Sequence, residues 1–94
     1  MPRPRLIKSS GNVFEDLGFS AEEAAILAMR AELMAQLRET IAHRGWTQVE
    51  AGKRLGVTQS RISDLVRGKA AKFSLDMLIT LASRAGKRVE LAVD

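Results

Sequence analysis

Hydrophobic residues recur along much of the chain at the three- and four-residue intervals of an amphipathic helix. The longest such pattern begins after Ser20, a capping residue, and stops at Gly45. Its apolar members form one continuous stripe: Ile26, Met29, Leu33, Leu37 and Ile41. We therefore predict one long helix from about residue 21 to Arg44.

This stripe is wider than a small core requires. Four further apolar residues extend it: Leu27, Ala31, Met34 and Ala35. Methionine suits both core filling and adaptable binding surfaces. We therefore expect residues 21–33 to cover either another chain or the N-terminal segment of the same chain.

Two shorter helical patterns follow and meet at a Gly-Val turn. Thr47 and Glu50 have the spacing of a capping box. Gly56 then ends the first helix, and Thr58 caps the second, which closes at Gly68. The apolar residues expected to face inward are Val57, Ile62, Leu65 and Val66. Two helices joined by so tight a turn, the second with a polar face, predict a helix-turn-helix that enters a DNA major groove. An ordinary helical hairpin is the alternative.

The polar face of the second helix carries the candidates for reading DNA bases. They are Gln59, Ser60, Arg61, Ser63 and Asp64. Glutamine can pair with adenine, arginine can pair with guanine, and a carboxylate can accept a hydrogen bond from cytosine. Arg61 has an alternative role, since it could hold a phosphate instead of a base.

The net charge of +4 is concentrated around these two helices. Residues 44–72 hold seven basic and two acidic residues, and the flanking parts add no positive surplus. Such a local excess is the electrostatic footprint of a duplex binder, although a solvated charged face gives the same count. We expect phosphate contacts from the basic residues that no nearby acid balances: Lys53, Arg54, Arg67, Lys69 and Lys72.

The N-terminal region has no long periodic pattern. Residues 1–19 include both prolines and are expected to be flexible or partly ordered, with a short helical turn at Val13 to Leu17. At the other end of the chain, a last helix is predicted from Ser74 to about Arg84.

Residues 87–93 alternate apolar and polar with the period of a β-strand. No other segment has a strand pattern, so we expect this strand to pair with the same strand of a second subunit. The dimer contact would then rest on Val89, Leu91 and Val93. A two-fold homodimer is what a helix-turn-helix needs to bind a palindromic operator in double-stranded DNA.

Composition leaves little room for other chemistry. There is no cysteine, and the single histidine, His43, has no metal ligands clustered around it in the sequence. We therefore expect no catalytic site, no metal and no cofactor. Trp46 is expected to be a lid on the core and not a base-stacking platform. Because no apolar run is long enough for a bilayer and the start lacks a signal-peptide core, we expect a cytoplasmic protein with no membrane partner.

The paired short helices resemble the helix-turn-helix of Xre/Cro-type repressors. The matching pieces are Thr47-Gln48, Leu55-Gly56-Val57-Thr58-Gln59, Ile62-Ser63 and Gly68. Gly52 departs from the pattern, because the family usually has alanine there. The resemblance implies an all-α, lambda-repressor-like domain of four main helices over residues 20–94.

The same resemblance implies roles for individual positions. Gln59, Ser60 and Asp64 occupy places that hold base-reading residues in the related repressors. Gln48 occupies the place of a phosphate contact at a helix N-terminus. We add Thr58, at the start of the next helix, to the phosphate-binding candidates.

The flanks resemble a narrower group, the HigA-like antitoxins, which pair with RelE/HigB-type ribonuclease toxins. The resembling stretches are residues 9–18, residues 73–76 and residues 86–91. This resemblance implies a repressor of its own operon that also binds and masks a basic ribonuclease. The alternative is a stand-alone Xre-family regulator with no toxin partner.

The candidate contacts for a toxin lie between residues 13 and 33. They are Phe14, Leu17, Phe19, Glu23 and Leu27. Six acidic residues between positions 14 and 39 suit a basic partner, although solvent-facing glutamates at helix starts give the same pattern. Phe14 and Phe19 have an alternative role, in which they fold back onto the long helix and complete the core.

Overall fold

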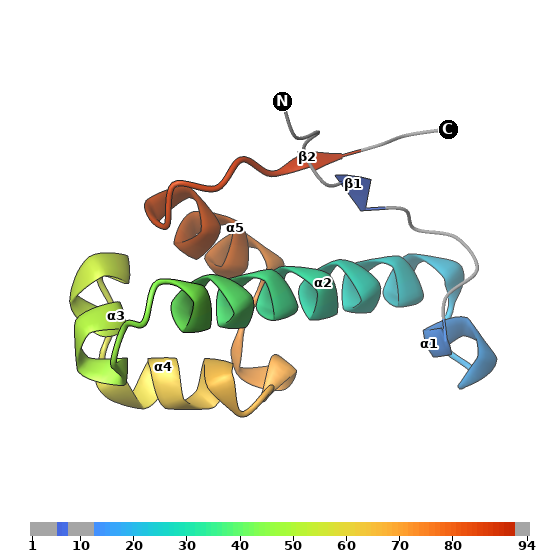
Figure 1. The fold of residues 1–94 in the computed structure, drawn as a ribbon. Coiled ribbons are helices and arrows are strands. Elements are labelled where there is room, and N and C mark those ends of the chain that lie inside the picture. The colour runs from blue at the N-terminus through green and yellow to red at the C-terminus, as the bar shows by residue number, and fades with distance from the viewer. Residues whose placement is uncertain (1–5, 8–12, 92–94) are drawn as a thin grey trace.

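The computed structural model of the protein describes residues 6–7 and 13–91. Its elements, shown in Figure 1, are β1 (Leu6–Ile7), α1 (Val13–Asp16), α2 (Ala21–His43), α3 (Gln48–Leu55), α4 (Gln59–Val66), the 3-10 helix η1 (Ala70–Lys72), α5 (Leu75–Arg84) and β2 (Glu90–Leu91). The fold is mainly helical, and its α-helices occupy approximately the predicted ranges, whereas the 3-10 helix η1 was not predicted.

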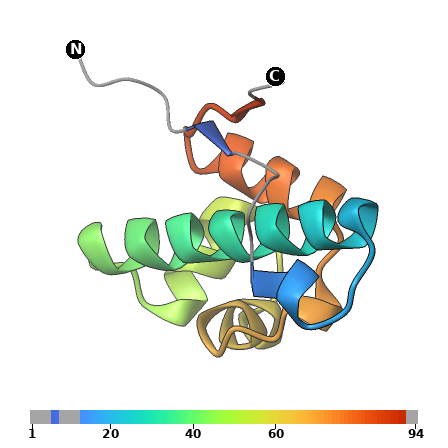
Figure 2. The same ribbon diagram turned by 90° about the vertical axis from the view of Figure 1, so that its right-hand side faces the viewer.

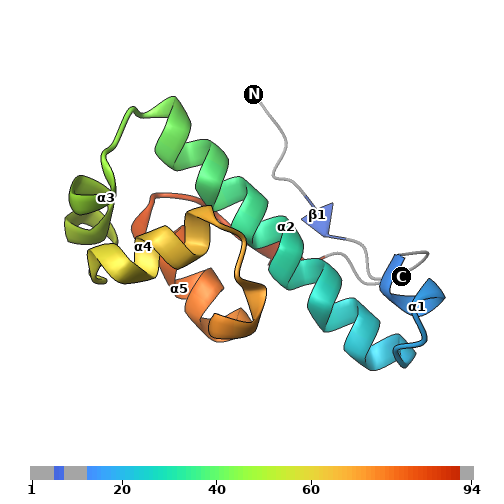
Figure 3. The same cartoon turned by 90° about the horizontal axis from the view of Figure 1, so that it is seen from below.

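The long helix α2 is the axis of the molecule (Figure 1). α5 packs against one side of α2 and α4 against the other, and α3 lies beyond the C-terminal end of α2. α1 packs beside the first turns of α2, at the opposite end (Figure 3). The helix-turn-helix and α1 are therefore separated by much of the length of α2.

The hydrophobic core lies between α2 and the helices around its C-terminal half. Its largest fully buried side chains are Met34, Leu37, Leu55, Ile62, Leu65, Phe73, Leu78 and Leu81. Burial of each such side chain stabilises the fold by roughly 1.5–3 kcal/mol. The stripe on α2 is buried from Leu33 to Ile41, where α4 and α5 pack against α2. In the first turns of α2, beside α1, Ala24 is buried but Ile26 is 47% exposed.

The expectation that Val66 faces inward is wrong. Val66 is the last residue of α4, and its side chain is 40% exposed. The other predicted apolar positions of this helix, Ile62 and Leu65, are fully buried, and Val57 packs against the core from the turn.

Hydroxyl side chains cap four helices at the predicted positions. Ser20, Thr47, Thr58 and Ser74 each accept a hydrogen bond from the backbone N–H three residues later, at 3.1 to 3.2 Å. At Thr47 only this half of the capping box forms. The Glu50 carboxylate lies 3.6 Å from Arg54 Nη2 and does not complete the box.

The strand pair joins the two ends of the chain. β1 runs parallel to β2, with Leu6 opposite Glu90 and Ile7 opposite Leu91, and the pair lies on the α5 side of α2, away from α4 (Figures 1 and 2). The expectation that the C-terminal strand has no mate within its own chain is therefore wrong.

β2 is also shorter than the predicted range, 87–93. Of the three residues expected at the dimer contact, Val89 packs against the core of its own chain and Leu91 lies in β2. Val93 lies outside the described residues. Pairing with a second subunit stays a prediction.

Candidate nucleic-acid interface

α3 and α4 meet at a turn in which backbone approaches backbone closely. α3 ends at Gly56, whose φ of 72° lies in the left-handed region that glycine enters without steric cost. Gly52, one turn earlier, faces this turn, and a Cβ atom there would stand 2.7 Å from the Val57 carbonyl oxygen. The departure from the repressor pattern at Gly52 thus has a steric reason, because glycine lets the turn lie closer to α3 than alanine would.

Arg84 of α5 forms a hydrogen bond at the C-terminal end of α3, next to this turn. Its Nη1 donates a hydrogen bond to the Leu55 carbonyl oxygen at 2.9 Å. The carbonyl groups of a last helical turn have no partner within the helix, and a cation there also interacts favourably with the helix dipole. Sequence reasoning missed Arg84, because only the packing of α5 against α3 brings it to Leu55.

Gln59 and Ser60 begin α4, and both side chains are exposed. Thr58 precedes them and caps the helix through the backbone N–H of Arg61. Ser63 and Asp64, one turn further, are half-buried. The start of α4 is therefore its accessible polar part, and in helix-turn-helix proteins the N-terminal residues of the second helix contact base edges.

Asp64 has both carboxylate oxygens next to lysines. Oδ1 lies 3.7 Å from Lys69 Nζ and Oδ2 lies 3.4 Å from Lys72 Nζ, while the Asp64 side chain is only 18% exposed. The expectation that no nearby acid balances Lys69 and Lys72 is wrong, because the loop after α4 folds back over Asp64. A role for these three residues in DNA binding stays a prediction.

Arg61 is held against the segment that leads to α5. Its Nη1 donates to the Lys72 carbonyl oxygen at 2.9 Å, and its guanidinium lies 4.9 Å from the centroid of the Phe73 ring. Phe73 is itself buried in the core. Arg61 thus ties α4 to the loop in this structure, and both roles considered for it on DNA remain predictions.

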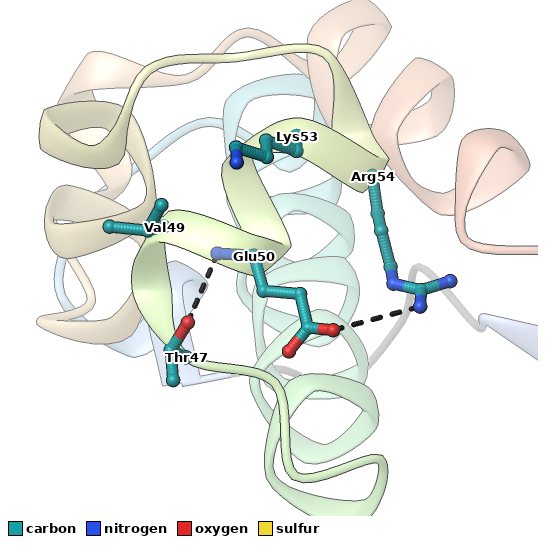
Figure 4. Close-up of a pocket in the computed structure, with 5 residues that line it drawn as sticks. All are labelled: Thr47, Val49, Glu50, Lys53 and Arg54. Carbon is teal, nitrogen blue, oxygen red and sulfur yellow. Dashed lines mark hydrogen bonds and ion pairs between the residues drawn. The ribbon is translucent and has the colours of Figure 1, made fainter.

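The other phosphate candidates lie on α3 and at the end of α4. Lys53 and Arg67 are exposed, and neither pairs with an acid within the described part of the chain. Arg54 forms an ion pair with Glu50 at 3.6 Å, so the expectation that no nearby acid balances Arg54 is also wrong (Figure 4). Both side chains line an open hollow with Thr47, Val49 and Lys53. Gln48 is half-buried as the first residue of α3.

Trp46 packs against the core, as its expected role as a lid requires. Arg44 and Arg54 also place their guanidinium groups 5.1 Å from the centroid of its ring. Each such cation–π contact is worth about 0.5–1 kcal/mol at an exposed site. The tryptophan therefore keeps two cations at the corner between α2 and α3, an arrangement that the sequence pattern did not reveal.

A family model described as a helix-turn-helix domain matches residues 13–94. The chain belongs to this helix-turn-helix family. The match includes α1 to α5 and supports a DNA-binding regulator. A search of curated proteins and a search of solved structures each found no match.

The helix-turn-helix protein has a second exposed surface, at α1 and the start of α2. Four apolar side chains are exposed there, at 60%, 69%, 42% and 47%: Val13, Leu17, Phe19 and Ile26. Phe14 is half-buried and packs edge-on against Phe19, with ring centroids 6.3 Å apart. Among the described residues, neither phenylalanine belongs to the hydrophobic core cluster, but α1 does pack beside the first turns of α2. Both the toxin contact and the alternative in which Phe14 and Phe19 complete the core stay predictions.

Two other toxin-binding candidates belong to the first turns of α2. The Glu23 carboxylate accepts a hydrogen bond from Ser20 Oγ at 2.8 Å, and Leu27 is half-buried. Leu17 and Phe19 are therefore the more accessible apolar candidates, and toxin binding by any of them stays a prediction.

Within residues 6–7 and 13–91, no helix of the helix-turn-helix protein is long and apolar enough to cross a membrane. The same residues contain no group of three or more histidine, cysteine, aspartate or glutamate side chains that could hold a metal ion.

Proposed function

We propose that this protein is a sequence-specific transcriptional repressor, active in the cytoplasm, whose helix α4 reads operator DNA. The observation that carries the proposal is the accessible start of α4, with one exposed cation on the preceding helix α3 and another at the C-terminal end of α4. Gln59 and Ser60 are exposed there, and Lys53 and Arg67 are exposed without an acidic partner in the described residues. Exposed polar side chains can contact base edges, and exposed cations on the neighbouring helix ends can contact phosphates.

The proposal is tested by selecting duplexes from a random pool with the purified protein. We expect a reproducible preferred sequence and an affinity that falls steeply with salt. The variant Gln59→Ala should change the preferred base at one position of each half-site, with a loss of roughly 1–3 kcal/mol. A pool that shows no enrichment after repeated selection would contradict sequence-specific reading.

A charge variant separates phosphate binding from base reading. Lys53→Ala should flatten the slope of log affinity against log salt by about 0.9, while the preferred sequence stays the same. Lys87→Ala is the matched control, because Lys87 is an exposed cation in the segment after α5, and α5 packs on the side of α2 opposite α4 (Figure 1). Equal effects from both variants would contradict a phosphate contact at Lys53.

We further propose that the repressor acts as a homodimer on a palindromic operator, with half-sites about one helical turn, roughly 34 Å, apart. Val89, Leu91 and Val93 are the candidate contacts. Because Val89 also packs on its own core, truncation after Glu90 is a sharper test than removal of the whole segment. We expect the truncated chain to sediment as a monomer and to bind the selected operator more weakly. A truncated chain that remains dimeric would place the contact elsewhere.

A second candidate function is that of an antitoxin, which masks a basic RelE/HigB-type ribonuclease as well as repressing its operon. The surface of α1 and early α2 favours it. Exposed Val13, Leu17, Phe19 and Ile26 lie among the acidic Glu15, Asp16, Glu22 and Glu23. Apolar contacts surrounded by negative charge suit a basic partner. The alternative remains a stand-alone regulator of the Xre family.

Co-purification distinguishes these two functions. A tagged copy of the protein, expressed with the untagged product of the adjacent gene, should retain that product if it is a toxin. Leu17→Ser should abolish retention and leave DNA binding intact, because Leu17 is 69% exposed and far from α4. Ile79→Ser, at a 40% exposed position on α5, is the matched control. Failure to retain any product would favour the stand-alone regulator.

A further inference from the structure

The loop after α4 is fixed to α4 by its backbone as well as by its side chains. The N–H of Gly68 donates to the Leu65 carbonyl oxygen at 3.1 Å, and the N–H of Lys69 donates to the Asp64 carbonyl oxygen at 3.0 Å. These two bonds form a Schellman motif, with Gly68 at φ 73° as the left-handed residue. The motif reverses the chain direction after α4, so the backbone of Lys69 lies next to that of Asp64.

The 3-10 helix η1 brings a second lysine, Lys72, next to the Asp64 carboxylate. Lys72 is the last residue of η1, and its carbonyl oxygen accepts the hydrogen bond from Arg61. Lys69 and Lys72 are 45% and 53% exposed, whereas Asp64 between them is 18% exposed. The carboxylate is thus covered by the ammonium groups, and they face solvent above it.

This geometry conflicts with a base-reading role for Asp64. A carboxylate that reads cytosine must offer an oxygen to the base amino group. Here each oxygen of Asp64 is already next to a different ammonium group. The same geometry has another effect. The Asp64 carboxylate pairs with Lys69 and Lys72, so a DNA phosphate must compete with it for these two ammonium groups.

We propose that Asp64 is an intramolecular substitute for a phosphate, and that it lowers the affinity of the protein for DNA of any sequence. By restraining Lys69 and Lys72, it removes part of the sequence-independent attraction and leaves selection to Gln59 and Ser60. Because this attraction is the same for every sequence, Asp64 weakens binding to operator and random DNA alike and leaves the ratio of the two affinities unchanged. This inference rests on the proposed DNA-binding function and assigns Asp64 a positioning role within it.

The test compares the parent protein with Asp64→Asn on two duplexes, a random-sequence duplex and one enriched by the parent, over a range of salt concentrations. We expect Asp64→Asn to bind both duplexes about two- to tenfold more tightly, because exposed ion pairs of this kind are weak and screened by salt. The salt slope should steepen by up to about 0.9 for each lysine that becomes free to contact a phosphate.

Two further variants make the result specific to this contact. Glu90→Gln removes one negative charge from β2, which lies on the side of α2 away from α4, and releases Arg88 from its ion pair (Figure 1). It therefore controls both for net charge and for the release of a cation away from α4. Lys69→Ala in the Asp64→Asn background should lose part of the gain in affinity, as expected if the freed lysine causes it. Circular dichroism melting establishes that each variant is folded at the temperature of the binding assay.

The possible outcomes separate the two proposals. If Asp64→Asn loses affinity only for the enriched duplex, Asp64 reads a base and the inference is overturned. Unchanged binding to both duplexes, or an equal gain from Glu90→Gln, also overturns it while DNA binding stands. A parent protein that binds no duplex at low salt overturns the proposed function, and the inference with it.

Discussion

Replacement of Gly52 by alanine should destabilise the protein, although alanine is the better helix former. A Cβ atom at this position would stand 2.7 Å from the Val57 carbonyl oxygen, 3.4 Å from the Thr58 carbonyl carbon and 3.5 Å from the Gln59 nitrogen. All three are backbone atoms of the turn and of the start of α4. The turn must therefore move away from α3, and no side-chain rotation can relieve the contact.

Two opposing effects set the size of the change. Alanine gains about 1 kcal/mol of helix propensity over glycine. Overpacking of a tight interior contact costs about 1–3 kcal/mol. The expected net change is a loss of up to about 2 kcal/mol in the free energy of unfolding. For a domain of this size, each 1 kcal/mol lowers Tm by roughly 4–8 °C.

Thermal and urea unfolding measure this change, and Ala31→Gly provides the matched control. Ala31 is an exposed residue in the interior of α2, so its replacement by glycine reports the propensity effect without a packing change. If Gly52→Ala stabilises the protein by as much as Ala31→Gly destabilises it, the close contact has no energetic consequence and the reasoning is refuted. We also expect Gly52→Ala to weaken DNA binding at temperatures where it is fully folded, because the displaced atoms begin α4.

Three other variants test the cap, the corner and the core. Thr58→Ala should lower the free energy of unfolding by about 1 kcal/mol by removing the cap of α4, whereas Thr58→Ser should retain stability in the same melting assay. Arg84→Met should lower the free energy of unfolding by up to about 1.5–3 kcal/mol, because it removes the charged hydrogen bond to Leu55, and by less to the extent that solvent screens this bond. Arg88→Met, at an exposed position, is the control and should leave the free energy of unfolding almost unchanged. Ile62→Ala, in the fully buried core, should cost about 2–5 kcal/mol in urea unfolding, and a similar loss from Ile26→Ala, at 47% exposure, would contradict the described core.

Local signals in the sequence were enough to predict the helices. Apolar spacing located the buried part of α2, and the hydroxyl caps and glycines located the ends of α3, α4 and α5. These signals act over a few residues, so they can be read without the fold. The same reasoning failed at Val66, where the helical pattern continued past the end of the core.

Contacts between distant segments could not be predicted in this way. β1 was missed, since a two-residue strand leaves no period to detect, and Arg84 was missed because Leu55 is far away in the sequence. The pairing of Asp64 with Lys69, in contrast, could have been predicted from the sequence. A glycine at position 68 indicates a Schellman motif, which returns the next residue to the last turn of the helix. The sequence analysis summed the charges of residues 44–72 and did not consider ion pairs among them.

The parallel pairing of β1 with β2 has a consequence for the order of folding and opening. Leu6 pairs with Glu90 across almost the whole chain, so in an unfolded chain this contact closes the largest loop of the described structure. Loop closure of that length is entropically costly, and two residues of ladder cannot offset it. We therefore expect β1 and β2 to pair only after α2 and α5 have packed together. Amide hydrogens of β2 should exchange with solvent through local opening, far faster than those of Ile62 and Leu65 in α4. β1 and β2 can thus separate and pair again while the helix-turn-helix stays folded.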